Sequence, residues 1–192
     1  MTLAGAVLLS YLLGSIPTGL WLGRTLRGVD IREHGSKNIG ATNTMRVLGK
    51  SLGALALAGD MGKGLIAVAV VARISPLSYA PLACGLAAIV GHTISVFCRF
   101  RGGKGVATAG GAFLGLCPIP TAIAIMVFAA VVAVTRMVSA GSIAASIALI
   151  TAIYVLPNDW PLRVVVTLVG LLVIIRHRSN IQRILRGEEN KV

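Results

Sequence analysis

The chain has 192 residues, of which 56% are hydrophobic and only 12% are charged, and its mean hydropathy is +0.87. Because this small number of charged residues cannot cover the surface of a soluble globule, the composition excludes soluble classes of protein. It predicts an all-α, polytopic membrane protein. The formal net charge of +12 first indicates orientation, because cations gather in the cytoplasmic loops of membrane proteins.

Apolar stretches long enough to cross a hydrocarbon core of about 30 Å predict seven membrane spans in one domain, residues 1–192. One uncharged region is too long for a single crossing, and we divide it at Pro118 and Pro120. The other boundaries give Thr2–Gly23, Ser51–Ala72, Ile74–Cys98, Gly105–Cys117, the stretch from the proline pair to Thr135, Val138–Leu156 and Leu162–Ile175. The first run has span length and no basic segment before it, so we expect no cleaved signal peptide.

The distribution of cations supports seven spans with the N-terminus outside and the C-terminus in the cytoplasm. In that arrangement fifteen of the 18 Lys and Arg residues lie on the cytoplasmic side. Only Arg73 and Arg163 lie outside, and Lys63 falls within a span. Six spans would move the C-terminal tail across the membrane and leave ten cations inside against seven outside, which the positive-inside rule disfavours.

Three polar, basic segments border the spans on the cytoplasmic side: His34–Lys50, Arg99–Thr108 and Arg176–Gly187. Glycine permits positive φ and close backbone approach, so successive N–H groups can hold an anion. The second segment also opens a span, where a helix N-terminus adds partial positive charge. The candidate substrate-binding residues in the first two segments are Gly35, Asn38, Gly40, Thr42, Asn43, Gly102, Gly103, Gly105 and Thr108. A loop that only had to be basic would need none of these, so the pattern predicts a phosphate site at the membrane surface.

Several of these motifs, in this order along nearly the whole chain, resemble the bacterial acyl-phosphate:glycerol-3-phosphate acyltransferases of the PlsY type. The matching stretches are Gly14–Pro17, Gly35–Asn43, Gly91–His92, Gly102–Thr108 and Arg176–Ile181. Two positions depart from the pattern and affect the expected loop shape: Lys37 stands where glycine is frequent, and Ser95 where proline is frequent.

The resemblance implies an integral enzyme of the bacterial inner membrane with its active site on the cytoplasmic side. Such an enzyme moves a fatty acyl group from acyl phosphate to the 1-hydroxyl of glycerol 3-phosphate, the first step of phospholipid synthesis. Its products are lysophosphatidate and inorganic phosphate. Membrane lipids surround it, and we expect no cofactor, no metal and no nucleic-acid partner.

The chemistry suggests roles for five catalytic candidates: Ser36, Arg46, Lys104, His177 and Asn180. Acyl phosphate is a mixed anhydride with a good leaving group, so direct transfer without an acyl-enzyme is expected. Arg46 and Lys104 would hold phosphate, with Ser36 among the neutral donors. Asn180, one helical turn beyond His177, would orient the acceptor hydroxyl or polarise the acyl carbonyl.

The sequence leaves the role of His177 open. The like charge of Arg176 and Arg178 favours the neutral imidazole that a general base needs. A histidine that only hydrogen-bonds a neighbouring loop is an equal alternative. A third scheme lets the donor's own phosphate accept the proton, and we favour it because carboxylates are scarce.

Polar residues inside the spans have two interpretations each. Asp60 and Lys63, spaced i,i+3, either form a structural pair or let Lys63 reach the substrate cavity. Ser139 and Ser142 either make interhelical hydrogen bonds, or, for Ser142, contact substrate. His92 is expected to be a buried, hydrogen-bonded histidine.

Small residues are expected to serve helix packing. The GxxxG pairs are Gly19/Gly23, Gly49/Gly53 and Gly111/Gly115, and the three cysteines, Cys84, Cys98 and Cys117, show no metal or disulfide spacing.

An anion channel or a phosphate-ester transporter is the competing class, since it too would place cations in a membrane bundle. Such proteins show inverted repeats and binding residues near the midplane, and neither is visible here. A lipid-binding scaffold is a third class, disfavoured by the amide- and glycine-rich loops. Acyl chain length preference and oligomeric state stay open, and a monomer is plausible.

Overall fold

The computed structural model describes residues 2–192 and is all-helical over that range, without a β-strand. Four helices are long and apolar enough to cross a membrane, and up to six spans result if each of two bent helix pairs counts as one. The all-α membrane class is thus confirmed, while the number of seven spans stays a prediction. The chain divides into two compact units, one up to Leu116 and one from Cys117 onward.

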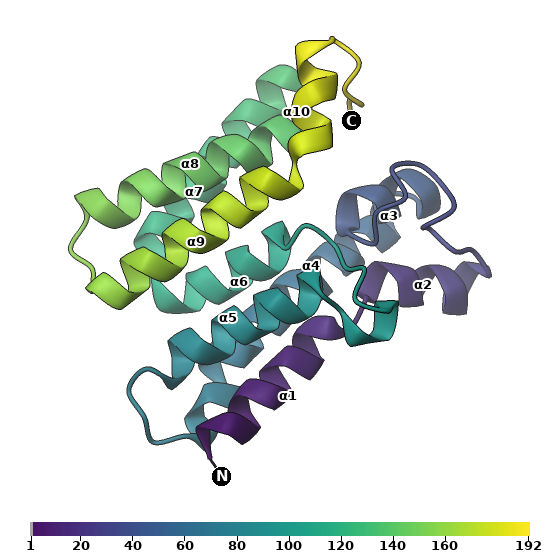
Figure 1. Ribbon diagram of the computed structural model, residues 1–192. Helices are drawn as coiled ribbons and strands as arrows, with labels where there is room; N and C mark the ends of the chain where they lie inside the picture. Colours follow the sequence, from purple (N-terminus) through teal and green to yellow (C-terminus); the bar gives the residue numbers. More distant parts are fainter. Residues whose placement is uncertain (1) are drawn as a thin grey trace. The chain divides into compact units, whose positions relative to one another are not determined.

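The first unit is built from six α-helices and two 3-10 helices. In chain order they are α1 (Leu3–Ser15), α2 (Thr18–Arg27), α3 (Ala41–Leu48), α4 (Lys50–Ala69), η1 (Val71–Ile74), α5 (Ala80–Thr93), η2 (Val96–Cys98) and α6 (Val106–Leu116). Helix α1 packs against α5, and α4 packs against α6. The end of α1, the start of α4, the end of α5 and the start of α6 lie at one end of this unit, together with α2 and α3 (Figure 1).

Glycines allow the backbones of α4 and α6 to touch. A methyl group on Gly64 would overlap the carbonyl oxygen of Thr108, and one on Gly111 would overlap that of Met61. In lipid no hydrophobic driving force brings helices together, so close van der Waals packing at small residues stabilises the helix pair instead. The packing role predicted for the GxxxG glycines holds for five of the six. Gly49 is the exception, because no atom lies within 4 Å of the place that a methyl group on it would occupy. It instead joins α3 to α4 with φ of +93°.

The first expected span, Thr2–Gly23, is not one straight helix. Helix α1 ends at Ser15, and α2 starts at Thr18 with a bend of 46° between them. Pro17 lacks an N–H and its ring clashes with the preceding turn, so it interrupts the helix. The carbonyls released at the break are satisfied by side chains: Ser15 O accepts from the Ser95 hydroxyl, and Ile16 O accepts from Lys63 Nζ over 2.9 Å.

The segment 34–50 also differs from the expected loop, because it contains the two-turn helix α3. Gly40 is the N-cap of α3, and its N–H is bonded to the Asn38 side chain over 2.9 Å, which closes a turn immediately before the helix. Arg46 therefore lies in the last turn of a helix rather than in a loop.

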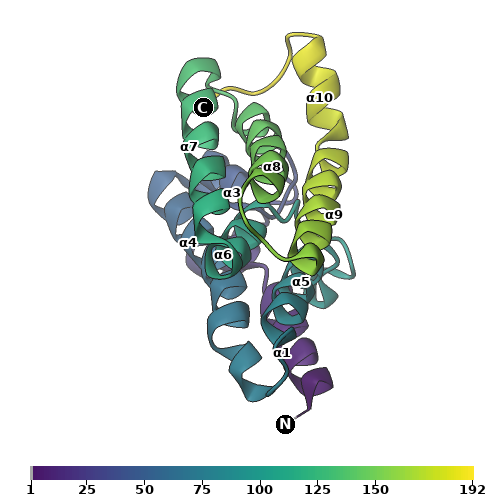
Figure 2. The same cartoon turned by 90° about the vertical axis from the view of Figure 1, so that its left-hand side faces the viewer.

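The second unit holds α7 (Pro118–Thr135), α8 (Val138–Val155), α9 (Trp160–Arg176) and α10 (Arg178–Leu185). Helix α8 packs against α7 and α9, and α10 continues beyond α9 after a bend of 54° (Figure 2). Helix α7 begins at Pro118, where the sequence predicted a break. Helix α6, with 11 residues and a length of about 16 Å, is the short element predicted before that break.

Candidate functional site

The loop between α2 and α3 is organised around the buried side chain of Asn43. Its Oδ1 accepts from the Ser36 N–H over 2.8 Å. Its Nδ2 donates to three carbonyls, those of Ile31 (2.8 Å), His34 (3.2 Å) and Asn38 (2.9 Å). Asn43 was predicted as a neutral donor to substrate, but the structure places its amide inside the loop. The amide thereby determines the shape of the segment that carries Ser36.

Three residues of this loop adopt the left-handed conformation that favours glycine, the first being Gly28 directly after α2, with φ of +65°. Gly35 has φ of +58°, and a methyl group there would overlap Asn43 Oδ1. Lys37 also has φ of +58°. The expectation that glycine would suit the position of Lys37 thus has a physical reason, because glycine adopts this conformation without steric cost.

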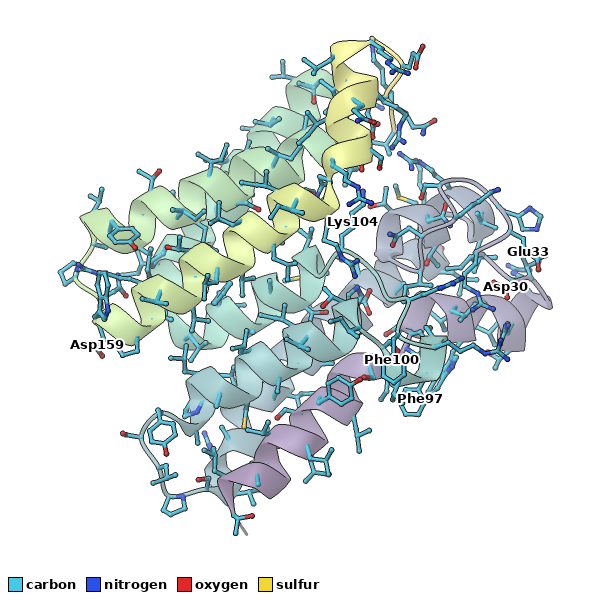
Figure 3. All side chains as sticks on the ribbon, in the orientation of Figure 1. Asp30, Glu33, Phe97, Phe100, Lys104 and Asp159 are labelled. Carbon is cyan, nitrogen blue, oxygen red and sulfur yellow. The ribbon has the colours of Figure 1, made fainter. Side chains whose placement is uncertain are left out.

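An ion-pair cluster anchors the start of the same loop. Asp30 accepts from Arg24 over 2.8 Å and from Arg32 over 2.6 Å. The hydrogen bond from Arg32 is the main reason that the pKa of Asp30 lies well below its ordinary value, and it outweighs the opposing effect of burial. Asp30 and Glu33 lie on the α2–α3 loop in Figure 3.

The other predicted residues of this segment lie at its surface or on α3. Ser36 and Arg46 are exposed, and Thr42 is half-buried in the first turn of α3. Exposed cationic and hydroxyl groups at one end of a membrane bundle can meet a polar substrate without the cost of opening the core.

The second predicted segment forms the connection between α5 and α6, and its residues Gly102–Gly105 are called the glycine loop below. Two backbone bonds fasten it to the end of α5: Gly102 N–H donates to Thr93 O (3.2 Å) and Gly103 N–H donates to His92 O (3.0 Å). Gly105 has φ of +84°, as expected for a glycine that enters a helix abruptly. Lys104 is half-buried on this connection (Figure 3). Positive φ was expected for glycines of both polar segments, but Gly40, Gly102 and Gly103 do not adopt it.

Thr108 lies in the first turns of α6 and is completely buried. Its Oγ1 has no hydrogen-bond partner in the part of the chain that the structure describes. Its carbonyl faces Gly64, so Thr108 contributes to the α4–α6 packing in addition to its predicted role.

The structure brings the first two polar segments to the same end of the first unit. Ile31 and Ile39 from the α2–α3 loop form one buried cluster with Leu20 of α2 and Cys98 of η2. The rings of Trp21 and Phe97 lie 5.7 Å apart and connect α2 to η2 in the same place. The sequence predicted three polar segments on one side of the membrane, and for the first two the shared core of this unit provides the proximity.

Asp60, Lys63 and His92 are buried next to each other in the first unit. The predicted pairing of Asp60 with Lys63 is confirmed, with Lys63 Nζ 2.9 Å from Asp60 Oδ1. Thr18 donates to the same carboxylate oxygen over 3.1 Å. Lys63 Nζ also lies 2.8 Å from Nδ1 of His92, which is buried and hydrogen-bonded as expected. Because protein acceptors surround Nζ, this geometry favours the structural interpretation of Lys63 over direct contact with substrate.

In the second unit the buried carboxylate of Glu189 collects three donors. Oε1 accepts from Asn180 Nδ2 (2.6 Å) and Ser139 Oγ (2.8 Å), and Oε2 accepts from Arg183 Nε (2.8 Å). Burial alone would raise the pKa of Glu189, but these donors stabilise the charged form and the pKa lies below its ordinary value. Sequence reasoning missed Glu189, which follows the last helix, and its proximity to Arg183 was the only signal available.

His177 lies at the bend between α9 and α10 and is buried. Its Nδ1 is 2.7 Å from Val173 O. A carbonyl oxygen only accepts, so Nδ1 carries a proton, and in the neutral ring Nε2 has the lone pair. This is the tautomer that a general base acting through Nε2 would need, and it equally fits a structural histidine.

Ser139 and Ser142 on α8 have different partners. The Ser139 hydroxyl donates to Glu189, whereas the Ser142 hydroxyl donates to Val138 O over 2.8 Å. The predicted substrate contact of Ser142 stays a prediction.

The chain matches the family model described as glycerol-3-phosphate acyltransferase over residues 4–187. It is 47% identical to the glycerol-3-phosphate acyltransferase of Geobacillus kaustophilus over 186 residues, covering 97% of this chain and 94% of the relative. It is 42% identical to that of Bacillus subtilis over 193 residues, covering 100% and 98%.

Two solved structures are also similar. Both are crystal structures of PlsY, an integral membrane glycerol 3-phosphate acyltransferase. The glycerol 3-phosphate form matches with a TM-score of 0.93 and 37% identity, over 99% of this chain and 95% of that one. The lysophosphatidic acid form matches with a TM-score of 0.90 and 36% identity, over 98% and 94%.

Proposed function

Because the chain belongs to the glycerol-3-phosphate acyltransferase family, and is therefore an enzyme and an integral membrane protein, we propose that it acylates the 1-hydroxyl of glycerol 3-phosphate using acyl phosphate as donor. The products are lysophosphatidate and inorganic phosphate. One observation carries the proposal: two cation-bearing segments, with Arg46 and Lys104, lie at the same end of an apolar helical unit. That arrangement suits substrates that combine a phosphate with a long apolar chain.

The transfer proceeds directly, without an acyl-enzyme. The hydroxyl oxygen attacks the acyl carbonyl, the bond between that carbonyl carbon and the phosphate oxygen breaks, and phosphate leaves. All three cysteines are buried, at most 3% exposed, which supports a mechanism without a thiol nucleophile.

We assign phosphate binding to Arg46 and Lys104, with Ser36, Thr42 and the N–H of Gly105 providing neutral donors. Gly102 and Gly103 shape the loop, because their N–H groups bond the end of α5. Thr108, whose buried hydroxyl has no partner among residues 2–192, remains in this set. Asn180 orients the acceptor hydroxyl or polarises the carbonyl, and its amide is held by Glu189. The proton of the hydroxyl passes to an oxygen of the departing phosphate, and His177 helps to place the reactants.

We further propose an inner-membrane location with seven crossings, the N-terminus outside and the active site on the cytoplasmic side. The support is the cation distribution, with fifteen of 18 Lys and Arg on one side. Single cysteines introduced at Asn158 and Lys191 should react with impermeant reagents from opposite faces of the membrane. The buried native cysteines should give little background.

The deciding experiment supplies purified protein with acyl phosphate and glycerol 3-phosphate, without ATP, acyl-CoA or added metal. We expect lysophosphatidate and inorganic phosphate in equal amounts. No turnover, together with anion flux across liposomes, would overturn the proposal in favour of a transporter.

A further inference from the structure

Lys63 has an acceptor for each of its ammonium protons. Its Nζ lies 2.9 Å from Asp60 Oδ1, 2.9 Å from Ile16 O and 2.8 Å from His92 Nδ1. Lys63 and Asp60 are 4% and 2% exposed, so water does not compete for these bonds. A protonated lysine has three donors and no acceptor, so His92 Nδ1 accepts.

This bond determines where the proton of the imidazole ring lies. A neutral histidine whose Nδ1 accepts carries its proton on Nε2. The Nε2 edge of the ring faces Gly103, because a methyl group on Gly103 would overlap that nitrogen. The backbone of the same two residues is also joined, since Gly103 N–H donates to His92 O over 3.0 Å. His92 thus bonds Gly103 through its carbonyl and packs its ring against the same residue, and Lys104 is the next residue.

We infer that Asp60, Lys63 and His92 form a positioning relay for the acyl-transfer site, an inference that rests on the proposed function. Lys63 fixes His92 as the Nε2–H tautomer, and His92 in turn holds the glycine loop in the shape that presents Lys104. Lys63 and His92 are therefore positioning residues and not phosphate ligands. The relay gives a reason for a charged pair inside a span, where each ionisable residue is costly.

The proton position is tested by nitrogen-15 NMR of histidine-labelled protein in bicelles, without substrate. The chain has three histidines, and loss of a signal in the His92→Gln variant identifies that of His92. We expect one protonated nitrogen, Nε2, in the wild-type ring. In the Asp60→Asn/Lys63→Met double variant, which removes both charges together, we expect a mixture of tautomers. A wild-type ring protonated at Nδ1, or a tautomer unchanged in the double variant, would overturn the relay.

The effect on the site is tested by comparing His92→Gln with His92→Leu. Glutamine can place an amide N–H where the ring has Nε2–H, whereas leucine cannot. We expect His92→Leu to raise KM for glycerol 3-phosphate by about tenfold or more, with a smaller change in kcat, and His92→Gln to stay within about threefold of wild type. Hydrogen exchange of the peptide 99–108 should be faster in His92→Leu only.

The exposed His34→Leu variant is the matched control and should behave as wild type. Equal kinetics and equal exchange in His92→Leu and wild type would refute the positioning role. A glutamine variant as impaired as the leucine variant would refute the role of the N–H. If wild-type protein itself failed to acylate glycerol 3-phosphate, the proposed function would fall, while the NMR result would still decide the tautomer.

Discussion

Asn180 of α10 donates a hydrogen bond to Glu189 Oε1 over 2.6 Å, and both side chains are buried. A carboxylate only accepts, so the bond fixes the amide with Nδ2 toward Glu189 and Oδ1 on the opposite side. Glu189 therefore determines the orientation of the Asn180 amide.

The first prediction concerns Glu189→Gln. The substitution keeps the shape of the side chain but removes the charge that accepts three donors, so we expect a loss of stability of about 1–3 kcal/mol. Turnover should also fall, because the orientation of Asn180 is no longer fixed. Thermal unfolding in detergent and acyl-transfer kinetics measure the two effects, and Glu188→Gln, next to it but exposed, is the control.

The pH dependence of this variant has a definite sign. The pKa of Glu189 is lower in the folded protein than its ordinary value, so its contribution to stability is complete above the unfolded pKa of about 4.3. The contribution is lost as the pH falls through the folded pKa. The difference in melting temperature between wild type and Glu189→Gln should therefore shrink between neutral pH and acid. A difference that stays constant down to the acid limit would contradict the ionised state of Glu189.

A second prediction concerns two left-handed residues of the α2–α3 loop, Gly35 and Lys37. Gly35→Ala should destabilise the protein by more than about 1 kcal/mol, because the new methyl group meets Asn43 Oδ1 and φ is positive. Lys37→Gly relieves a strain of about 1–2 kcal/mol and should not lower the melting temperature. Thermal unfolding of both variants is the measurement. An alanine variant as stable as wild type would show that the loop does not hold this conformation.

A third prediction tests the phosphate-binding cations. Arg46→Ala and Lys104→Ala should each reduce turnover at least tenfold, since the loss of a charged contact to phosphate costs about 2 kcal/mol. Arg27→Ala, at the exposed end of α2, should leave the rate unchanged. Initial rates at several glycerol 3-phosphate concentrations give kcat and KM separately. Normal kinetics in either of the first two variants would remove that residue from the site.

A fourth prediction separates the two schemes for proton transfer. If the departing phosphate takes the proton, His177→Ala should lower kcat by less than about tenfold, whereas loss of a general base typically costs about 10²–10⁴-fold. Rates across a pH series supply the comparison. A severe loss, with the acid limb of the profile abolished, would make His177 the base.

Local signals predicted much of the fold. Pro118 and the turn around Pro157 and Pro161 interrupt apolar runs, so the start of α7 and the α8–α9 connection follow from residues next to each other in sequence. The glycine pair of α6, Gly111 and Gly115, likewise predicted close packing, which the structure shows. The bend at Pro17 had a signal of the same kind, but the length of the surrounding apolar run obscured it.

The features that sequence reasoning missed depend on contacts between distant residues. The bond between Lys63 and His92 joins positions 29 apart, and that between Ser139 and Glu189 joins positions 50 apart. The hydrophobic periodicity of a sequence indicates secondary structure and gives no information about contacts between residues so far apart. The bonds of the Asn43 amide to the preceding loop were missed for a related reason, because the sequence does not show whether a side-chain amide bonds a ligand or its own backbone.

Contact between the backbones of α4 and α6, at Gly64 and Gly111, has a mechanical consequence. Two helices that touch without intervening side chains cannot slide or rotate past each other without atomic overlap. Lys63 and the first turn of α6 must therefore move as one rigid piece. The glycine loop that leads into α6 is therefore fixed at both ends, by α6 packed against α4 and by its own backbone bonds to the end of α5.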